Sequence, residues 1–208
     1  MKRQVSNTAI NWHYIAVAMI FAVAIFIMVL YMPNLREIDS QILKTIRQFL
    51  LPFPQYIPLF INEIGKDYYI WPLVASGSVL VSHKHNLEAF MLILFTQLSF
   101  LVKEWIKNYV CRERPCGDAY PGFSFPSGHS VIAMCFYGIL IYLVARYVRG
   151  FWRYFLISLF GLLIILAGLS RLWLGLHFPT DVLEGFLIGF ILVNLFIILD
   201  KFFSTKAE

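Results

Sequence analysis

The stretch HYIAVAMIFAVAIFIMVLYM, residues 13–32, carries no Asp, Glu, Lys or Arg. About 20 apolar residues in an α-helix are enough to cross a hydrocarbon core about 30 Å thick, so we predict a transmembrane helix here. The run follows Met1-Lys2-Arg3 and ends at Tyr31-Met32-Pro33 rather than at an Ala-x-Ala-like cleavage site. We therefore interpret it as an uncleaved signal anchor with a cytoplasmic N-terminus.

Apolar runs of this kind recur along the chain, in which 60% of the residues are hydrophobic and only 14% are charged. The mean hydropathy of +0.72 exceeds what a water-soluble domain needs to cover its surface. We predict an all-α polytopic membrane protein with a single integral membrane domain over residues 1–208. The six expected transmembrane helices lie at approximately 13–32, 67–82, 87–106, 129–147, 153–173 and 180–200.

The net charge of +5 raises the question of nucleic-acid binding. The Lys and Arg residues lie in short connections between apolar runs and not on one face, so we predict no nucleic-acid partner. The expected partner is the lipid bilayer. The pattern does not indicate an oligomeric state.

The distribution of positive charge also bears on orientation. With a cytoplasmic N-terminus, eight of the 17 Lys and Arg residues fall on the cytoplasmic side. Three of the others, Lys107, Arg114 and Arg171, belong to the candidate site described below, and setting them aside leaves six outside. Because short cytoplasmic loops carry an excess of Lys and Arg, we expect a plasma membrane protein of the bacterial inner membrane, with its site on the external, periplasmic face.

The segment REIDSQILKTIRQFLL, residues 36–51, is too charged to span a membrane. Its apolar residues recur with the period of a helix, which predicts an amphipathic helix lying in the membrane interface after the first span. Such a helix either packs against the bundle or lines an entrance for lipids. The apolar positions are Ile38, Ile42, Leu43, Ile46, Phe49 and Leu50.

Polar residues collect in three segments at span ends that the expected topology places on one side of the membrane. The segments are KNYVCRERP (107–115), PSGH (126–129) and SRLWLGLHFPTD (170–181). We therefore expect these three segments to meet outside the bilayer core.

The PSGH segment stands at the start of a predicted helix, where backbone N–H groups have no partner within the helix. These donors and the helix dipole favour an anion, and Ser127 adds a hydroxyl donor. Gly128 allows an anion to approach closely. Taken alone, Ser127 is better explained as an ordinary helix N-cap.

Lys107, Arg114 and Arg171 would bring three positive charges to the same place. Each of them alone is compatible with a side chain that extends to lipid headgroups. Three cations beside an anion-binding helix end suit the charged oxygens of a phosphoryl group in transfer. We therefore predict that Lys107, Arg114, Ser127, Gly128 and Arg171 bind a phosphate.

His177 stands four residues before Asp181, with Pro179 at an expected first helical turn between them. A carboxylate that accepts a hydrogen bond from the imidazole would fix its tautomer and make it a better nucleophile. His129, two residues after Ser127, is then placed to protonate the leaving oxygen as a general acid. A histidine at a membrane surface is otherwise an ordinary interface residue, and the pairing with Asp181 favours catalysis.

Metal binding is a rival use of the same residues. A divalent cation would be repelled by Lys107, Arg114 and Arg171, and Asp181 is the one carboxylate placed to compensate. We therefore predict no metal ligands and no cofactor.

The chain carries Lys107-x6-Arg114-Pro115, then Pro126-Ser127-Gly128-His129, then Ser170-Arg171-x5-His177-x3-Asp181. In order and spacing this pattern resembles the type 2 phosphatidic acid phosphatase family, and with the six spans the resemblance covers nearly the whole chain. The resemblance implies a metal-independent phosphatase of membrane lipids that acts through a phosphohistidine at His177, with Asp181 as its orienting group and His129 as the acid. It also implies the phosphate-binding roles given above.

Three other functions share parts of this pattern. A lipid phosphotransferase would use the same residues and differ only in its acceptor. An anion transporter would also collect basic residues, but transporters hold their sites near the bilayer midplane, where these spans have no ionisable residue. Vanadium haloperoxidases share such motifs but are soluble. The sequence leaves open whether the lipid is phosphatidylglycerophosphate, phosphatidic acid, a polyprenyl diphosphate or a lipid A phosphate.

Cys111 and Cys116 bracket Arg114-Pro115 in a loop expected outside the cell, where disulfides are permitted. A bridge requires the chain to turn near Pro115, because a continuous helix would hold the two Cα atoms too far apart. The sequence is compatible with a disulfide and with two free thiols. Cys135 lies in an apolar span, where we expect a free thiol.

Overall fold

The structure, a computed structural model, describes residues 12–66 and 70–206. Within these ranges the chain forms α-helices and one short 3-10 helix, η1 (Gly117–Ala119), without strands. The α-helices are α1 (Trp12–Tyr31), α2 (Leu35–Leu50), α3 (Tyr56–Lys66), α4 (Ile70–Ser82), α5 (Asn86–Val110), α6 (Gly128–Tyr147), α7 (Phe151–Trp173) and α8 (Pro179–Lys206). The predicted all-α class is confirmed.

In the part of the chain that the structure describes, five helices are long and apolar enough to cross a membrane, namely α1, α5, α6, α7 and α8. The second expected span, 67–82, overlaps α4, which has 13 residues and a length of about 20 Å, and residues 67–69 of that expectation lie outside the described residues. The polar stretch NEIGKD, residues 62–67, interrupts the apolar pattern before it. A separate helix that was not predicted, α3, precedes α4 and includes residues 62–66 of this stretch.

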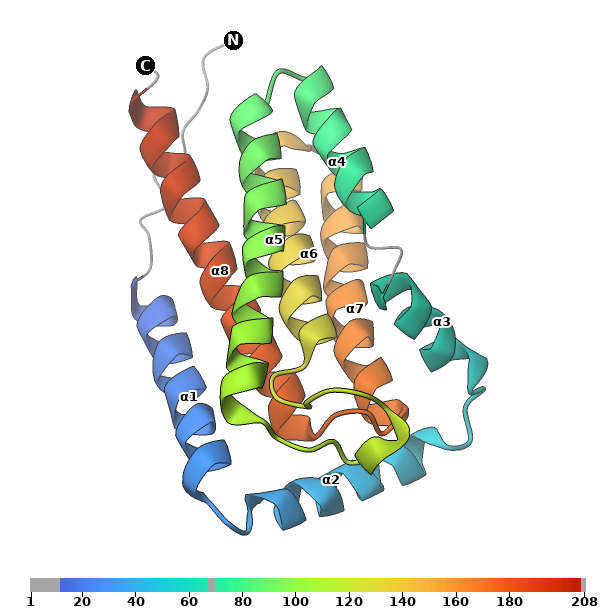
Figure 1. Cartoon of the computed structure of the whole chain (residues 1–208). Helices are drawn as coiled ribbons and strands as arrows, with labels where there is room; N and C mark the ends of the chain where they lie inside the picture. Colours follow the sequence, from blue (N-terminus) through green and yellow to red (C-terminus); the bar gives the residue numbers. More distant parts are fainter. Residues whose placement is uncertain (1–11, 67–69, 207–208) are drawn as a thin grey trace.

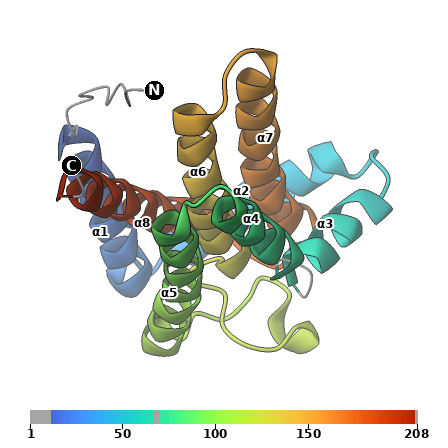
Figure 2. The same ribbon diagram turned by 90° about the horizontal axis from the view of Figure 1, so that it is seen from above.

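Helix α6 occupies the centre of the bundle and contacts α5, α7 and α8 (Figures 1 and 2). Helix α1 packs on α8, α3 packs on α7, and α4 packs on α5. The apolar core lies between α5, α6 and α8, where Leu92, Ile139 and Phe196 are fully buried.

Glycines on α8 allow its backbone to lie close to α6. A Cβ atom at Gly185 would come 2.8 Å from the carbonyl oxygen of Ser127, and one at Gly189 would come 2.8 Å from that of Val131. Small residues permit such approaches between membrane helices. The close packing holds the first turn of α8 against the start of α6, where the backbone N–H of Ser127 donates to the carbonyl of Asp181 at 2.9 Å.

Helix α2 runs across the lower end of the bundle in Figure 1, roughly perpendicular to the long helices. This arrangement confirms the predicted amphipathic helix. Its inward stripe consists of Leu35, Asp39 and Leu43, spaced four residues apart and all buried. Leu43 packs with Phe178 and Val182, so α2 covers the segment that joins α7 to α8.

Candidate active site

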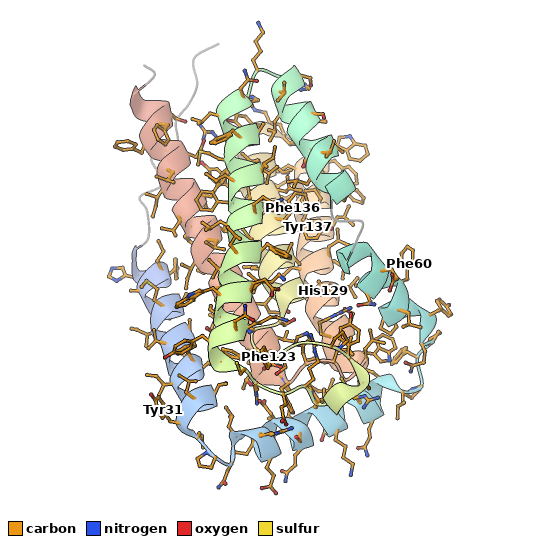
Figure 3. The ribbon with its side chains drawn as sticks, in the orientation of Figure 1. Tyr31, Phe60, Phe123, His129, Phe136 and Tyr137 are labelled. Atoms are coloured by element: carbon orange, nitrogen blue, oxygen red, sulfur yellow. The ribbon has the colours of Figure 1, made fainter. Side chains whose placement is uncertain are left out.

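The three polar segments meet at the lower end of the bundle. Lys107 lies in the last turn of α5, the loop 111–127 leads to α6, and His177 lies in the turn between α7 and α8. In Figure 3, His129 lies near the lower end of α6, with Phe136 and Tyr137 higher on the same helix and Phe123 in the loop beneath. The structure thus brings together segments that are up to about 70 residues apart in the sequence, as the Arg112 to Asp181 contact shows.

His177 is 3% exposed and has partners at both ring nitrogens. Its Nδ1 atom lies 2.7 Å from the backbone carbonyl of Ser124, which only accepts hydrogen bonds. Arg114 Nη1, which only donates, lies 3.1 Å from Nε2. These two partners require the tautomer with a proton on Nδ1 and a lone pair on Nε2.

Burial lowers the pKa of His177 to about 4, because it penalises the charged imidazolium. The nearby carboxylate of Asp181 opposes this shift, while the positive charges of Arg114 and Lys107 add to it. His177 is therefore neutral near pH 7, as a nucleophile must be.

The hydrogen bond predicted between Asp181 and His177 is replaced by another arrangement. Asp181 Oδ2 lies 3.6 Å from His177 Nδ1, and it accepts a hydrogen bond of 2.8 Å from the backbone N–H of Phe178. Its other oxygen, Oδ1, accepts from Arg112 Nη1 at 2.6 Å. Asp181 thus lies beside the imidazole as a negative charge, while the Ser124 carbonyl accepts the hydrogen bond from Nδ1.

Arg112 is a residue of this region that the sequence reasoning missed. Its guanidinium donates to Thr180 Oγ1 at 2.8 Å and to Asp39 Oδ2 at 2.7 Å, in addition to Asp181. Asp39 is 1% exposed and lies on α2. Two carboxylates therefore neutralise Arg112 and join α2 to the start of α8. The sequence contains one signal for this contact: Asp39 is a charged residue between Leu35 and Leu43 on the inward face of the amphipathic helix.

Arg114 and Lys107 both donate to carbonyls of the loop before α6. Arg114 Nε donates to Gly122 at 3.0 Å, and its Nη1 also donates to Leu176 at 3.0 Å. Lys107 Nζ donates to Phe123 at 3.0 Å. Burial lowers the pKa of Arg114 from its ordinary value. The two cations therefore shape the loop and surround His177 with positive charge.

Arg171 is 1% exposed at the end of α7. Its Nε donates to Ser170 Oγ at 3.3 Å, whereas its buried Nη2 has no hydrogen-bond partner in the part of the chain that the structure describes. A buried donor without a partner is costly, and more so when it is charged. A phosphate oxygen would satisfy this guanidinium, which acts electrostatically on His129.

The PSGH segment forms the start of α6 with Ser127 at the N-cap position. The Ser127 side chain makes no capping hydrogen bond, and its Oγ accepts from Ser130 Oγ at 3.0 Å. Gly128 lies directly against Lys103, because a Cβ atom there would come 2.9 Å from Lys103 Cδ. His129 Nε2 lies 3.4 Å from the backbone carbonyl of Asn62 on α3.

An apolar groove begins at His129 and runs between α3, α4, α6 and α7. His129 is the one titratable side chain in its lining apart from Tyr137. Its lining residues are Ile61, Pro72, His129, Ile132, Ala133, Phe136, Tyr137, Leu163, Leu166 and Ala167. The groove is therefore mainly apolar, and its lining includes the candidate acid His129.

Cysteine and carboxylate positions complete the description. Cys111, Cys116 and Cys135 are all free thiols, so the disulfide that the sequence allowed between the first two is not formed. Among residues 12–66 and 70–206, no group of three or more His, Cys, Asp or Glu side chains is arranged to hold a metal ion.

Comparison with known proteins agrees with this geometry. The model of the PAP2 superfamily matches residues 87–203. Phosphatidylglycerophosphatase B of Bacillus subtilis is 28% identical over 162 residues, which cover 74% of this chain and 79% of that protein. Undecaprenyl-diphosphatase of Sulfolobus acidocaldarius is 24% identical over 140 residues, which cover 63% of each chain.

Two solved structures share the fold. A transmembrane PAP2 type phosphatidylglycerolphosphate phosphatase from Bacillus subtilis superposes with a TM-score of 0.80 at 25% identity, covering 90% of this chain and 96% of that one. LpxE of Aquifex aeolicus superposes with a TM-score of 0.57 at 23% identity, covering 74% and 93%. Because the family model spans more than half of the sequence and includes all three polar segments, the chain belongs to the PAP2 superfamily.

Proposed function

We propose that the protein removes a phosphate group from a membrane lipid through a phosphohistidine at His177, without a metal ion. Its place in the PAP2 superfamily and its similarity to phosphatidylglycerophosphatase B make the chain a hydrolase of lipid phosphates.

The first step forms a bond between His177 Nε2 and phosphorus and breaks the bond between phosphorus and the lipid oxygen. The leaving oxygen takes a proton from His129. In the second step water attacks phosphorus, the P–N bond breaks, and His129 accepts a proton from the water. Inorganic phosphate leaves and His177 returns to its neutral form, so each atom and proton is accounted for.

The observation that carries this proposal is the fixed tautomer of His177. The Ser124 carbonyl holds the proton on Nδ1, which leaves the Nε2 lone pair directed toward the guanidinium of Arg114. A phosphoryl group bound between Arg114 and the unpartnered Nη2 of Arg171 would meet that lone pair. Positive groups around a transferring phosphoryl group stabilise its transition-state charge.

The apolar groove supports a lipid as the leaving group. It extends from His129 between helices whose outer faces are apolar, so a lipid chain can lie in it while the phosphate reaches the polar end. The substrate class that we propose includes phosphatidylglycerophosphate, phosphatidic acid, polyprenyl diphosphate and lipid A phosphates. All of them carry a terminal phosphate at the headgroup level.

We place the site on the external face of the plasma membrane. The charge distribution supports this orientation, as does the interfacial helix α2 at the same end as the site. The phosphates of external-leaflet lipids would then reach Arg171 and His177 without crossing the bilayer.

Phosphate release by the purified protein tests the proposal. The assay compares the four lipid classes, with and without EDTA and vanadate, and with and without a lipid acceptor. We expect release in excess EDTA, inhibition by vanadate, and loss on the order of 10² or more in R171A, because a transition-state contact is lost. R149A, which changes an exposed arginine elsewhere, is the matched control. Loss of activity on chelation that Mg²⁺ restores would contradict the metal-free mechanism, and transfer to the lipid acceptor in place of release would identify a phosphotransferase.

A further inference from the structure

Lys103 is a buried cation beside the site that none of the motifs includes. It is 8% exposed and lies one helical turn before Lys107 on α5. Its side chain runs along Gly128, since a Cβ atom there would come 3.5 Å from Lys103 Nζ. The ammonium group therefore lies at the N-terminal end of α6, where the helix dipole already favours an anion.

The partners of Lys103 do not explain its burial. It forms an ion pair with Glu104, whose side chain is 42% exposed, and its Nζ lies 3.9 Å from the centre of the Phe100 ring. An ion pair with a half-exposed carboxylate contributes little to stability. Burying a lysine is costly, and this contact compensates only part of the cost.

The position of Lys103 relative to His129 indicates its role. Lys103 and Arg171 are buried cations on two different helices, α5 and α7. Arg171 belongs with Arg114 and His177, which surround the transferred phosphoryl group in the proposed mechanism. The Lys103 side chain lies against Gly128, the residue before His129, and His129 protonates the leaving oxygen in the proposed mechanism, so we place Lys103 beside the leaving group.

We propose that Lys103 binds a second phosphate in the leaving group and so favours lipids whose leaving group is anionic. This inference rests on the proposed function of the site. When the terminal phosphate is transferred, the leaving group of a lipid diphosphate is a lipid monophosphate. The leaving group of phosphatidylglycerophosphate still carries its anionic phosphodiester. The leaving groups of phosphatidic acid and of prenyl monophosphates are neutral alcohols, which offer Lys103 no charge to bind.

Farnesyl diphosphate and farnesyl monophosphate form a matched pair, because they differ only in the second phosphate. The experiment measures kcat/KM for both in the wild type, K103M, K103Q, K103R and the control K44M, which removes an exposed lysine from α2 at the same end of the bundle. Monodisperse elution in size-exclusion chromatography selects folded variants.

We expect K103M and K103Q to lower kcat/KM for the diphosphate at least tenfold and for the monophosphate less than threefold. K103R and K44M should keep the wild-type ratio within threefold. An equal fall in kcat/KM on both substrates would overturn the inference and make Lys103 a general structural or phosphate contact. Wild-type values of kcat/KM on both substrates would also overturn it. A wild type that releases phosphate from neither substrate would count against the proposed function itself, which separates the two failures.

Discussion

Nδ1 of His177 donates a hydrogen bond of 2.7 Å to the backbone carbonyl of Ser124. A backbone carbonyl cannot be removed by a side-chain substitution, so the tautomer of His177 does not depend on any one side chain. The carboxylate of Asp181, 3.6 Å away, contributes charge instead of orientation.

The first prediction concerns the loss of activity in the D181N variant. In a serine protease triad, where the carboxylate sets the tautomer, the same change costs about 10⁴ in rate. Here we expect a loss on the order of 10², because only the negative charge beside the imidazole is lost. The measurement is kcat/KM on the best lipid substrate, with E113Q, which changes an exposed carboxylate of the loop 111–127, as control. A loss of 10⁴ or more in folded D181N would show that the carboxylate sets the tautomer after all.

The second prediction concerns the protonation of His177. Its pKa is lowered to about 4 by burial, so the imidazole should stay neutral from pH 8 down to about pH 5 and take up a proton only below that. Between about 6.5 and 4 the unfolded chain binds this proton and the folded chain does not, so the contribution of His177 to stability falls as the pH falls through this window. Solution NMR of histidine-labelled protein in micelles, with the signal assigned by its loss in H177N, measures this directly. A titration midpoint near 6.5 would contradict the account.

The bundle and the three site segments could be predicted from the sequence because their signals are local. Hydropathy identifies α1, α5, α6, α7 and α8, and the period of the apolar residues identifies α2. The spacing within each polar segment identifies candidates such as Lys107, His129 and His177.

Other features depend on tertiary contacts and have no local signal. The carbonyl that holds His177 comes from Ser124, 53 residues earlier, and nothing in the spacing of His177 and Asp181 points to it. The partner of Asp39 is Arg112, 73 residues later.

The third prediction tests the link between α2 and α8. R112M removes the cation between the buried carboxylates of Asp39 and Asp181, and breaking a buried pair in this way costs about 3–5 kcal/mol. We expect the thermal unfolding midpoint in detergent to fall by about 10 °C. R36M is the matched control. Arg36 lies on α2, as Asp39 does, and its ion pair with Glu113 is exposed and worth at most about 1 kcal/mol. Equal midpoints for R112M and R36M would contradict a structural role for this network.

The fourth prediction concerns orientation and uses a native residue. Cys111 is exposed beside the site, whereas Cys135 is buried. In a C116S background, a membrane-impermeant maleimide added to intact cells should label Cys111, because we place the site on the external face. C111S in the same background is the control. Labelling that occurs only after the cells are broken would reverse the proposed topology.

Direct trapping of the intermediate tests the central claim. Purified protein is mixed with a lipid labelled in its terminal phosphate, quenched in alkali within one turnover, and digested for peptide mass spectrometry. We expect a phosphate that is stable in base and labile in acid on the peptide that contains His177, appearing before inorganic phosphate and absent from H177N. Turnover by the wild type with the label on another residue, or full activity in folded H177N, would contradict catalysis through His177.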